Sequence, residues 1–206
     1  ELEGVVHALD FLWKVNFGEK MEVGKNVVVI GGGNVAMDAA KNALKLGAEE
    51  VTILYRRSRE EMPANPWEVK EAEETGVKIE FLVAPKKILE KNGNVSAVEC
   101  IRMQLGEPDE SGRRKPIPME GSEFTRETDM VILAIGEVPD LEFLPKEMEL
   151  NEDGTIWINP MTMETSLKGV FAGGDAVTGP ASVIEAIRDG RRAAESIENY
   201  LNSLGG

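Results

Sequence analysis

Residues 26–36 read NVVVIGGGNVA, and this stretch decides the fold. The apolar run over 26–30 predicts a compact strand, and the Ala-rich stretch 34–46, closed by Gly47, predicts a helix. A second run of β-branched and apolar residues over 50–55 predicts the next strand. Strand, helix and strand within about 30 residues form a βαβ unit, which implies a parallel sheet and an α/β fold.

The glycines between the first strand and the helix have the spacing of a dinucleotide-binding turn. Gly31 permits a tight turn, Gly33 lets the backbone approach a pyrophosphate, and Ala36 stands where a third glycine is usual. The helix that opens with Asn34 and Val35 directs free N–H groups and its positive dipole end at that anion. Glycines also serve plain tight turns, but this position after a strand and before a helix favours a Rossmann-like dinucleotide site.

The end of the second strand indicates which dinucleotide binds. An NAD site places Asp or Glu there to accept a hydrogen bond from the ribose 2′-hydroxyl. This sequence instead reads YRRSR at 55–59. A guanidinium offers paired donors to a phosphate dianion, so Arg56 and Arg57 suit the 2′-phosphate of NADP(H). The alternative is a solvated basic patch that answers Glu60 and Glu61.

Outside this unit the pattern predicts further elements. Helices are expected over 2–17 and 66–75, strands over 77–83 and 130–135, and a polar loop over 106–118. The runs 86–90 and 95–103 flank Asn92-Gly93, which predicts an antiparallel hairpin. Short strands are expected over 155–158 and 170–172. A long helix over 182–201 is expected to direct an apolar stripe inward, formed by Ile184, Ile187, Ala194 and Ile197.

The composition excludes several functions. A net charge of -14 argues against a nucleic-acid surface, which needs Lys and Arg in excess. One cysteine and one histidine exclude a disulfide, a CxxC redox pair, a Cys-ligated iron–sulfur cluster and a zinc site built within this sequence. Cys100 is expected to be a small buried hydrophobe. No apolar run has the length of about 18 residues that a membrane span needs, and we expect a cytoplasmic protein.

A second glycine signature lies at 169–176, GVFAGGDA, and is followed by Gly179-Pro180-Ala181-Ser182 and the long helix. A strand that ends in Gly-Gly-Asp can place a carboxylate beside a ribose-like diol, while the next helix N-terminus faces an anion or a ring carbonyl. Taken alone, an Asp after two glycines is more often a turn or a cap.

These motifs together resemble one family. The stretches 28–40, 51–64 (VTILYRRSREEMPA), 128–139 (TDMVILAIGEVP) and 169–194 are similar, in this order, to the FAD/NADPH oxidoreductases of the glutamate synthase small (beta) subunit type. That group belongs to the pyridine nucleotide-disulfide oxidoreductase superfamily. The family's first GxGxxG and its Cys-rich N-terminal region have no counterpart here, and the sequence starts at Glu1. We therefore expect a C-terminal piece of a longer protein.

The resemblance implies a domain arrangement and a set of cofactor contacts. Residues 24–140 would form the NADP-binding Rossmann-like domain, and 141–206 the closing segment of an FAD-binding module whose earlier segment ends in 1–23. NADP would meet Gly31, Gly33, Asn34, Val35, Arg56 and Arg57 and pass close to Gly136. FAD would meet Gly174 and Asp175, with the backbone of Ser182 and Val183 facing the flavin ring.

The resemblance also implies a function. The longer protein would pass hydride from NADPH to FAD, and electrons would leave through iron–sulfur centres outside this sequence, a large subunit or a ferredoxin-like acceptor. Nicotinamide and flavin do this chemistry, so no catalytic acid or base is expected. The isolated chain is expected to be inactive and to self-associate through uncovered apolar surface. Two alternatives stay open: a non-catalytic NADP-binding module, and a thioredoxin reductase type of enzyme, which would need a CxxC pair.

Overall fold

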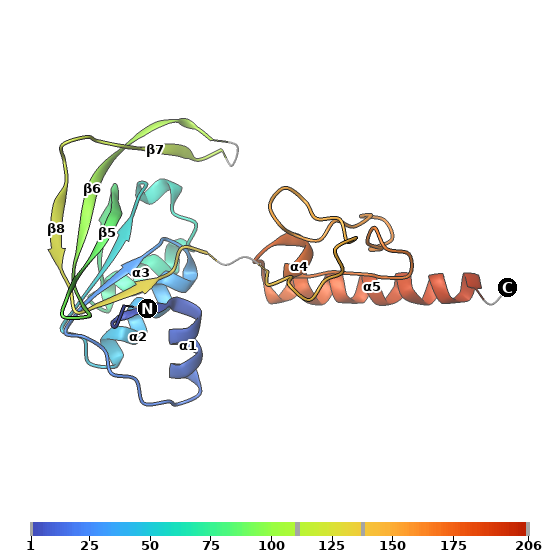
Figure 1. Ribbon diagram of the computed structural model, residues 1–206, viewed down its shortest axis with the longest axis horizontal. Coiled ribbons are helices and arrows are strands. Elements are labelled where there is room, and N and C mark those ends of the chain that lie inside the picture. The colour runs from blue at the N-terminus through green and yellow to red at the C-terminus, as the bar shows by residue number, and fades with distance from the viewer. Residues whose placement is uncertain (1, 110–111, 137–138, 205–206) are drawn as a thin grey trace. The chain divides into compact units, whose positions relative to one another are not determined.

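The computed structural model describes residues 2–109, 112–136 and 139–204. The chain divides into two compact units, Glu1–Gly136 and Glu137–Gly206 (Figure 1). Residues 2–23 therefore belong to the same compact unit as the Rossmann-like part of the chain. Unit 2 begins close to the boundary expected after residue 140.

A five-stranded parallel sheet forms the centre of unit 1, in the order β1-β9-β2-β3-β4. All four neighbouring pairs are parallel, and β2 lies between β3 and β9. The strands are β1 (Val5–His7), β2 (Asn26–Ile30), β3 (Glu50–Tyr55), β4 (Lys78–Phe81) and β9 (Met130–Leu133). The parallel Rossmann-like sheet predicted from the βαβ unit is confirmed.

Both faces of this sheet are buried, as the continuous apolar runs of its strands require. Val27 and Val29 pack in one core cluster with the helices, whereas Val28 and Ile30 pack in a second cluster with the antiparallel sheet. The helices of unit 1 are α1 (Ala8–Asn16), α2 (Asn34–Lys45) and α3 (Pro66–Glu74). The period of two along each strand thus divides its side chains between two layers.

The second layer is an antiparallel sheet in which β6 pairs with β5, β7 and β8. These strands are β5 (Val83–Lys91), β6 (Asn94–Pro108), β7 (Arg114–Pro118) and β8 (Phe124–Glu127). Asn92 and Gly93 join β5 to β6 with φ angles of 57° and 85°. Positive φ at both central residues is the requirement of a type I′ hairpin, and the predicted antiparallel excursion is confirmed.

Two stretches of unit 1 differ from the sequence-based expectation. The helix expected over 2–17 is shorter, because Val5–His7 is a strand that pairs with β9. The loop expected over 106–118 is instead the end of β6 followed by β7. Most residues of this ribbon are exposed or half-buried, so no apolar alternation indicates a strand there.

Unit 2 contains two described helices, the short α4 (Asp175–Thr178) and the long α5 (Val183–Leu204). The strands expected over 155–158 and 170–172 are absent from its described residues, and isolated bridges take their place, among them Ile158↔Thr165 and Glu164↔Phe171. An isolated bridge lacks the repeated ladder hydrogen bonds of a strand. The loops of unit 2 are therefore held by turns and by α5.

The buried face of α5 is opposite to the one expected. Asp189 is the buried residue of the helix, and Tyr200, about three turns beyond it on the same face, meets Phe171 edge-on at a ring separation of 5.7 Å. Ile184 and Ile187, expected to point inward, are 79% and 52% exposed. Small and polar side chains on the Asp189 face allow the loops to approach closely: a Cβ added at Gly173 would lie 3.2 Å from the Cβ of Asp189.

The contact of α1 with α2 allows a test of whether the N-terminal segment is part of the unit 1 core. Phe11 is fully buried in the cluster shared with α2, whereas Trp13 on the same helix is 55% exposed. We predict that Phe11→Ala lowers the free energy of unfolding by about 3–5 kcal/mol, through lost transfer energy and a cavity. Trp13→Ala, the control, is expected to cost less than about 1 kcal/mol. Urea unfolding of both variants is the measurement, and equal losses would contradict this packing.

Candidate functional site

The glycine turn follows β2 at the carboxyl edge of the parallel sheet. Gly31 has φ of +145°, and a Cβ added there would lie 2.1 Å from the carbonyl oxygen of Ala134. A Cβ at Gly32 would lie 2.4 Å from the ring of Tyr55. The chain passes between β9 and β3 only because these two residues carry no side chain. Both glycines are required by the fold itself.

Gly33 is different. Its φ and ψ of -89° and 176° are open to any residue, and a Cβ added there would meet no described atom within 4 Å. The space beside it therefore lies outside the chain's own packing. The first two N–H groups of α2, those of Asn34 and Val35, have no intrahelical partner, and the first turn carries no acidic residue. A backbone that a phosphate can approach, at a helix N-terminus free of negative charge, fits a pyrophosphate.

The sheet topology places this turn where ligands of open α/β sheets bind. The chain leaves β2 toward β3 and β4 on one side, while β9 lies on the other side. The carboxyl ends of β2 and β9 therefore flank a topological switch point. Gly31 follows β2 directly, and Gly136 lies just past β9 with φ of +99° and no described atom within 4 Å of an added Cβ.

A loop after β3 is fastened onto the glycine turn. The N–H of Ala64 donates to the carbonyl of Gly32 at 3.0 Å, and the N–H of Asn65 donates to Oδ1 of Asn34 at 2.8 Å. The Tyr55 hydroxyl donates to the carbonyl of Glu61 at 2.6 Å. The side chain of Asn34 thus holds the loop. The strand-end loop, residues 56–65, lies beside the start of α2.

The three arginines of this loop have different environments. Arg56 is exposed. Arg57 is 5% exposed, and its Nη2 lies 2.5 Å from Oδ2 of Asp109. Arg59 stacks over the ring of Phe81, with Cζ 5.1 Å from the ring centre, and pairs with Glu73. Arg56 is thus the exposed arginine of this loop that has no ion pair within the described residues, and Arg57 would have to leave Asp109 to reach a nucleotide.

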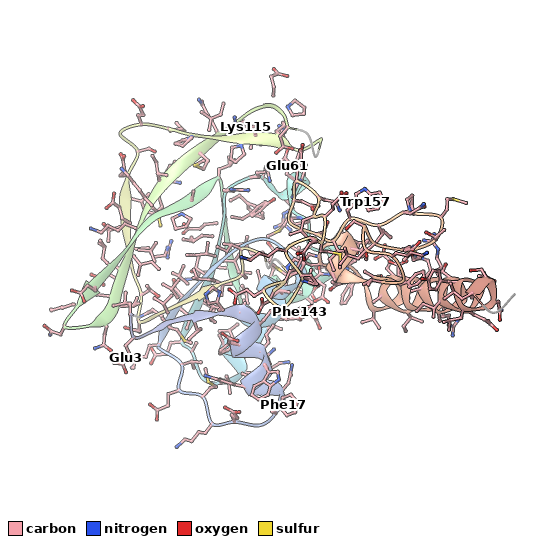
Figure 2. The ribbon with its side chains drawn as sticks, turned by 45° about the vertical axis from the view of Figure 1, so that its right-hand side comes forward. Glu3, Phe17, Glu61, Lys115, Phe143 and Trp157 are labelled. Atoms are coloured by element: carbon pink, nitrogen blue, oxygen red, sulfur yellow. The ribbon has the colours of Figure 1, made fainter. Side chains whose placement is uncertain are left out.

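Sequence reasoning missed the partners that the antiparallel ribbon supplies. Arg114, the first residue of β7, pairs through Nε with Glu61, and its Nη2 lies 3.4 Å from the Ser58 hydroxyl. Ser58 and Arg114 together hold the pKa of the Glu61 carboxyl below its ordinary value. Glu61 and Lys115, the neighbour of Arg114, lie at one end of unit 1 (Figure 2). Opposite charges within 106–118 were the available signal, but their partners are far away in sequence.

Unit 2 holds the second glycine signature. Gly174, with φ of +71°, precedes α4, and Asp175 is exposed. Asp175 lines a cavity of about 270 Å³ together with Pro139, Asp140, Leu141, Phe143, Ala176 and Pro180. Phe143 and Trp157 of this unit are both exposed (Figure 2). The predicted contact between Asp175 and a ribose-like diol stays a prediction, and the exposed carboxylate beside the cavity is compatible with it.

The start of α5 is capped from within. The N–H and hydroxyl of Ser182 both donate to Oε2 of Glu185, at 2.9 Å and 2.7 Å. The Glu185 N–H lies 3.4 Å from the Ser182 hydroxyl, which completes a reciprocal capping box. The N–H of Ser182 is thus already satisfied, and Val183, 76% exposed, begins the helix. The N–H groups of the first turn after Ser182 are the ones that a ligand could reach.

Three further observations concern cysteine reactivity, metal binding and membrane spans. Cys100 is buried as expected, and burial raises the pKa of its thiol to about 11, so it is a poor nucleophile at neutral pH. Within residues 2–109, 112–136 and 139–204, no group of three or more His, Cys, Asp or Glu side chains could hold a metal ion. None of the described helices combines the length and apolar character of a membrane span.

The fold is Rossmann-like, and its glycine turn lies at the carboxyl ends of the parallel strands, where proteins of this fold bind dinucleotides. A family model described as pyridine nucleotide-disulphide oxidoreductase matches residues 1–190, and the chain belongs to this family.

Several curated proteins are similar in sequence. The chain is 49% identical over 199 residues to the NADP(+)-dependent formate dehydrogenase subunit beta of Moorella thermoacetica, covering 96% of this chain and 28% of that protein. It is 47% identical to the NADPH-Fe(3+) oxidoreductase subunit beta of Geobacter sulfurreducens, covering 94% and 32%. It is 42% identical to the glutamate synthase [NADPH] small chain of Azospirillum brasilense, covering 98% and 45%. The chain thus spans less than half the length of each.

Two solved structures share the fold. Thioredoxin reductase of T. acidophilum matches with a TM-score of 0.69 and 27% identity, covering 87% of this chain and 53% of that one. FprA of Mycobacterium tuberculosis in complex with NADPH matches with a TM-score of 0.72 over all of this chain and 60% of that one. At 19% identity, the second likeness concerns the fold alone.

The contrast between Gly33 and Gly31 gives a test of the site. We predict that Gly33→Val abolishes binding of NADPH and NADH alike, because the new side chain fills the space that a pyrophosphate needs, while the protein stays folded. Calorimetric titration and thermal unfolding measure the two effects. Gly31→Val is the matched control and is expected to cost more than about 2 kcal/mol of stability. Retained nucleotide binding by Gly33→Val would show that the glycine run is only a turn.

Proposed function

We propose that this chain is the NADPH-binding part of a flavin-dependent oxidoreductase that passes hydride from NADPH to FAD. The observation that carries the proposal is the open space at Gly33 beside the start of α2, together with the exposed Arg56 at the end of β3. Gly31, Gly33, Asn34 and Val35 would hold the pyrophosphate side of the nucleotide, and Gly136 would pass close to it. Arg56 would meet the 2′-phosphate, with Arg57 beside it.

The choice of NADPH over NADH rests on the residue type at the end of β3. Arg56 follows Tyr55, the last residue of that strand, where an NAD site has a carboxylate. Glu60 and Glu61 lie further along the loop, and Arg114 pairs with both of them. Their negative charge is therefore partly compensated, and the guanidinium of Arg56 is left to meet a phosphate. Three of the similar curated proteins carry NADP or NADPH in their names.

The reaction itself asks for little acid–base chemistry from the chain. The nicotinamide of bound NADPH supplies the hydride, and the protein contributes binding and orientation. In unit 2, Gly174 and Asp175 would hold part of FAD, and the first turn of α5 at Ser182 and Val183 would face the flavin ring. The positive end of this 22-residue helix favours negative charge near its start. We name no catalytic residue and no metal ligand.

The partners we propose follow from the same assignment. Electrons would leave through iron–sulfur clusters outside this chain, to a large subunit or a ferredoxin-like acceptor, in the cytoplasm. The Moorella and Geobacter relatives are each named as a subunit beta. The exposed apolar side chains of α5, Val183, Ile184, Ile187, Leu201 and Leu204, give the isolated chain a surface for self-association.

The nucleotide preference has a direct test. We predict that the chain binds NADPH more tightly than NADH and that Arg56→Ala weakens NADPH by about 10- to 100-fold, the loss of a charged hydrogen-bond donor, while NADH binding is nearly unchanged. The preference should shrink at high salt, because the contact is exposed. Calorimetry with both nucleotides at low and high salt measures this, with Arg191→Ala, at an exposed arginine of α5, as the control. Equal affinities of the unaltered chain for both nucleotides would overturn the proposal.

The flavin site has a separate test. One strand–glycine–helix unit is present in the described chain, at β2 and α2, and we assign it to NADP. Unit 2 supplies contacts for only part of FAD, so we predict that the purified 206-residue chain is colourless and barely oxidises NADPH. Absorbance between about 350 and 500 nm, together with an NADPH oxidation assay with added FAD, is the measurement. A yellow preparation with stoichiometric flavin would contradict the assignment.

A further inference from the structure

The ribbon of β6 and β7 is fastened to the strand-end loop at two points. Near the end of β6, the carboxylate of Asp109 pairs with Nη2 of Arg57 at 2.5 Å, and the carbonyl of Arg114 accepts from Nε of the same arginine at 2.8 Å. Four residues further along the loop, Glu61 pairs with the side chain of Arg114. The two attachments bracket Ser58, Arg59 and Glu60. The ribbon thus fixes the loop that begins with Arg56.

The first attachment carries the greater energetic constraint. The Arg57 side chain is 6% exposed, whereas that of Arg114 is 46% exposed. A buried guanidinium needs an opposite charge and hydrogen-bond acceptors, because an unpaired charge away from water is costly. Asp109 supplies the charge and the Arg114 carbonyl supplies a second acceptor. If Asp109 loses its charge, the buried guanidinium of Arg57 loses its opposite charge, and the ribbon holds the loop that carries Arg56 less firmly.

The backbone joins the same elements. Leu82 lies between β4 and β5 with φ of 57°, a conformation that costs a bulky residue energy and persists only when its surroundings enforce it. Its N–H donates to the carbonyl of Arg57 at 3.1 Å, and its carbonyl accepts from the N–H of Met103 on β6 at 2.8 Å. Arg57 is therefore held at its backbone by the joint between the two sheets and at its side chain by the ribbon.

We propose that Asp109 is a positioning residue for NADPH selectivity. By holding Arg57 in the wall of the site, Asp109 fixes the backbone from which Arg56 reaches the 2′-phosphate. In this arrangement Arg57 is the anchor of the phosphate site, and Arg56 is its ligand. The proposal rests on the NADPH site described above and assigns a specificity role to a residue 52 positions from Arg57 in sequence.

The alternative role for Arg57 predicts the opposite change in NADPH affinity. If Arg57 were itself a phosphate ligand, the carboxylate of Asp109 would compete with the nucleotide for the same guanidinium. Removing the Asp109 charge would then strengthen NADPH binding. If Asp109 positions the loop, removing its charge weakens NADPH binding. The direction of the change in the dissociation constant therefore separates the two roles.

The experiment compares Asp109→Asn with the unaltered 206-residue chain, by calorimetric titration with NADPH and NADH. Asn keeps the size of Asp and lacks its charge. We expect NADPH to bind about tenfold more weakly, the equivalent of roughly one charge-assisted hydrogen bond, and NADH to bind as before. In the background of Arg56→Ala, Asp109→Asn should cause no further loss. Asp109→Glu, which keeps the charge, should restore most of the preference.

The matched control is Glu123→Gln, which removes an ion pair of the same antiparallel sheet, Lys86 Nζ to Glu123 Oε1 at 2.8 Å, away from the loop. It should leave both affinities unchanged. If Asp109→Asn unfolds the chain, Asp109→Ser, which also lacks the charge and is smaller, takes its place, and the direction of the change in NADPH affinity again separates the two roles.

Tighter NADPH binding, an equal loss for both nucleotides, or no change would each overturn the positioning role of Asp109. The proposed function is judged separately. If the unaltered chain binds no NADPH, the proposed function fails. If it binds NADPH in an Arg56-dependent manner but Asp109→Asn has no effect, only this inference fails.

Discussion

The narrow passage of the chain between Ala134 and the ring of Tyr55 is the constraint on which the rest of the site depends. Side chains at Gly31 or Gly32 would overlap Ala134, just past β9, or Tyr55 at the end of β3, since their Cβ atoms would lie 2.1 Å and 2.4 Å from the nearest atoms. The close approach brings the end of β2 to the switch point and starts α2 immediately after it. The Tyr55 hydroxyl, on the same ring that closes over Gly32, holds Glu61 and with it the strand-end loop. Tyr55 therefore contacts both halves of the proposed nucleotide site, the glycine turn through its ring and the strand-end loop through its hydroxyl.

The antiparallel sheet has two roles in this fold. Val83, Val98 and Cys100 cover the face of the parallel sheet that the helices leave open, as the buried strands require. The same sheet extends past this core as the β6–β7 ribbon, where its residues are mostly exposed and its charged side chains meet the strand-end loop. Leu82 joins the two roles, because its two backbone hydrogen bonds connect Arg57 to β6. The antiparallel sheet thus completes the core and also holds the strand-end loop in place.

Elements that depend on residues close together in the sequence were predicted, whereas elements and contacts that depend on pairing between distant residues were missed. The strand–glycine–helix unit, α3 and the Asn92-Gly93 hairpin were predicted because periodicity, caps and turn residues lie within a few positions of one another. Strand β1 was missed because its three residues become a strand only by pairing with β9, which lies more than 120 residues later in the sequence. The face of α5 was assigned wrongly, since an apolar stripe says nothing of whether the chain supplies a surface to cover it. The different environments of Arg56 and Arg57 depend on Asp109, and adjacent identical residues carry no signal of that difference.

The charge of the chain also limits how the proposed site can work. With a net charge of -14, the long-range field repels a nucleotide, so attraction has to come from groups close to the phosphates. Most cations near the strand-end loop are already compensated: Arg57 by Asp109, Arg59 by Glu73, and Arg114 by Glu60 and Glu61. The exposed guanidinium of Arg56 and the open N–H groups at the start of α2 remain as local positive features. Such short-range contacts discriminate between nucleotides by geometry more than they raise the rate of encounter, because each acts within a few ångströms. An acidic chain can therefore select the more negative of two nucleotides, provided that its few uncompensated donors are rigidly placed, and the ribbon that holds Arg57 supplies that rigidity.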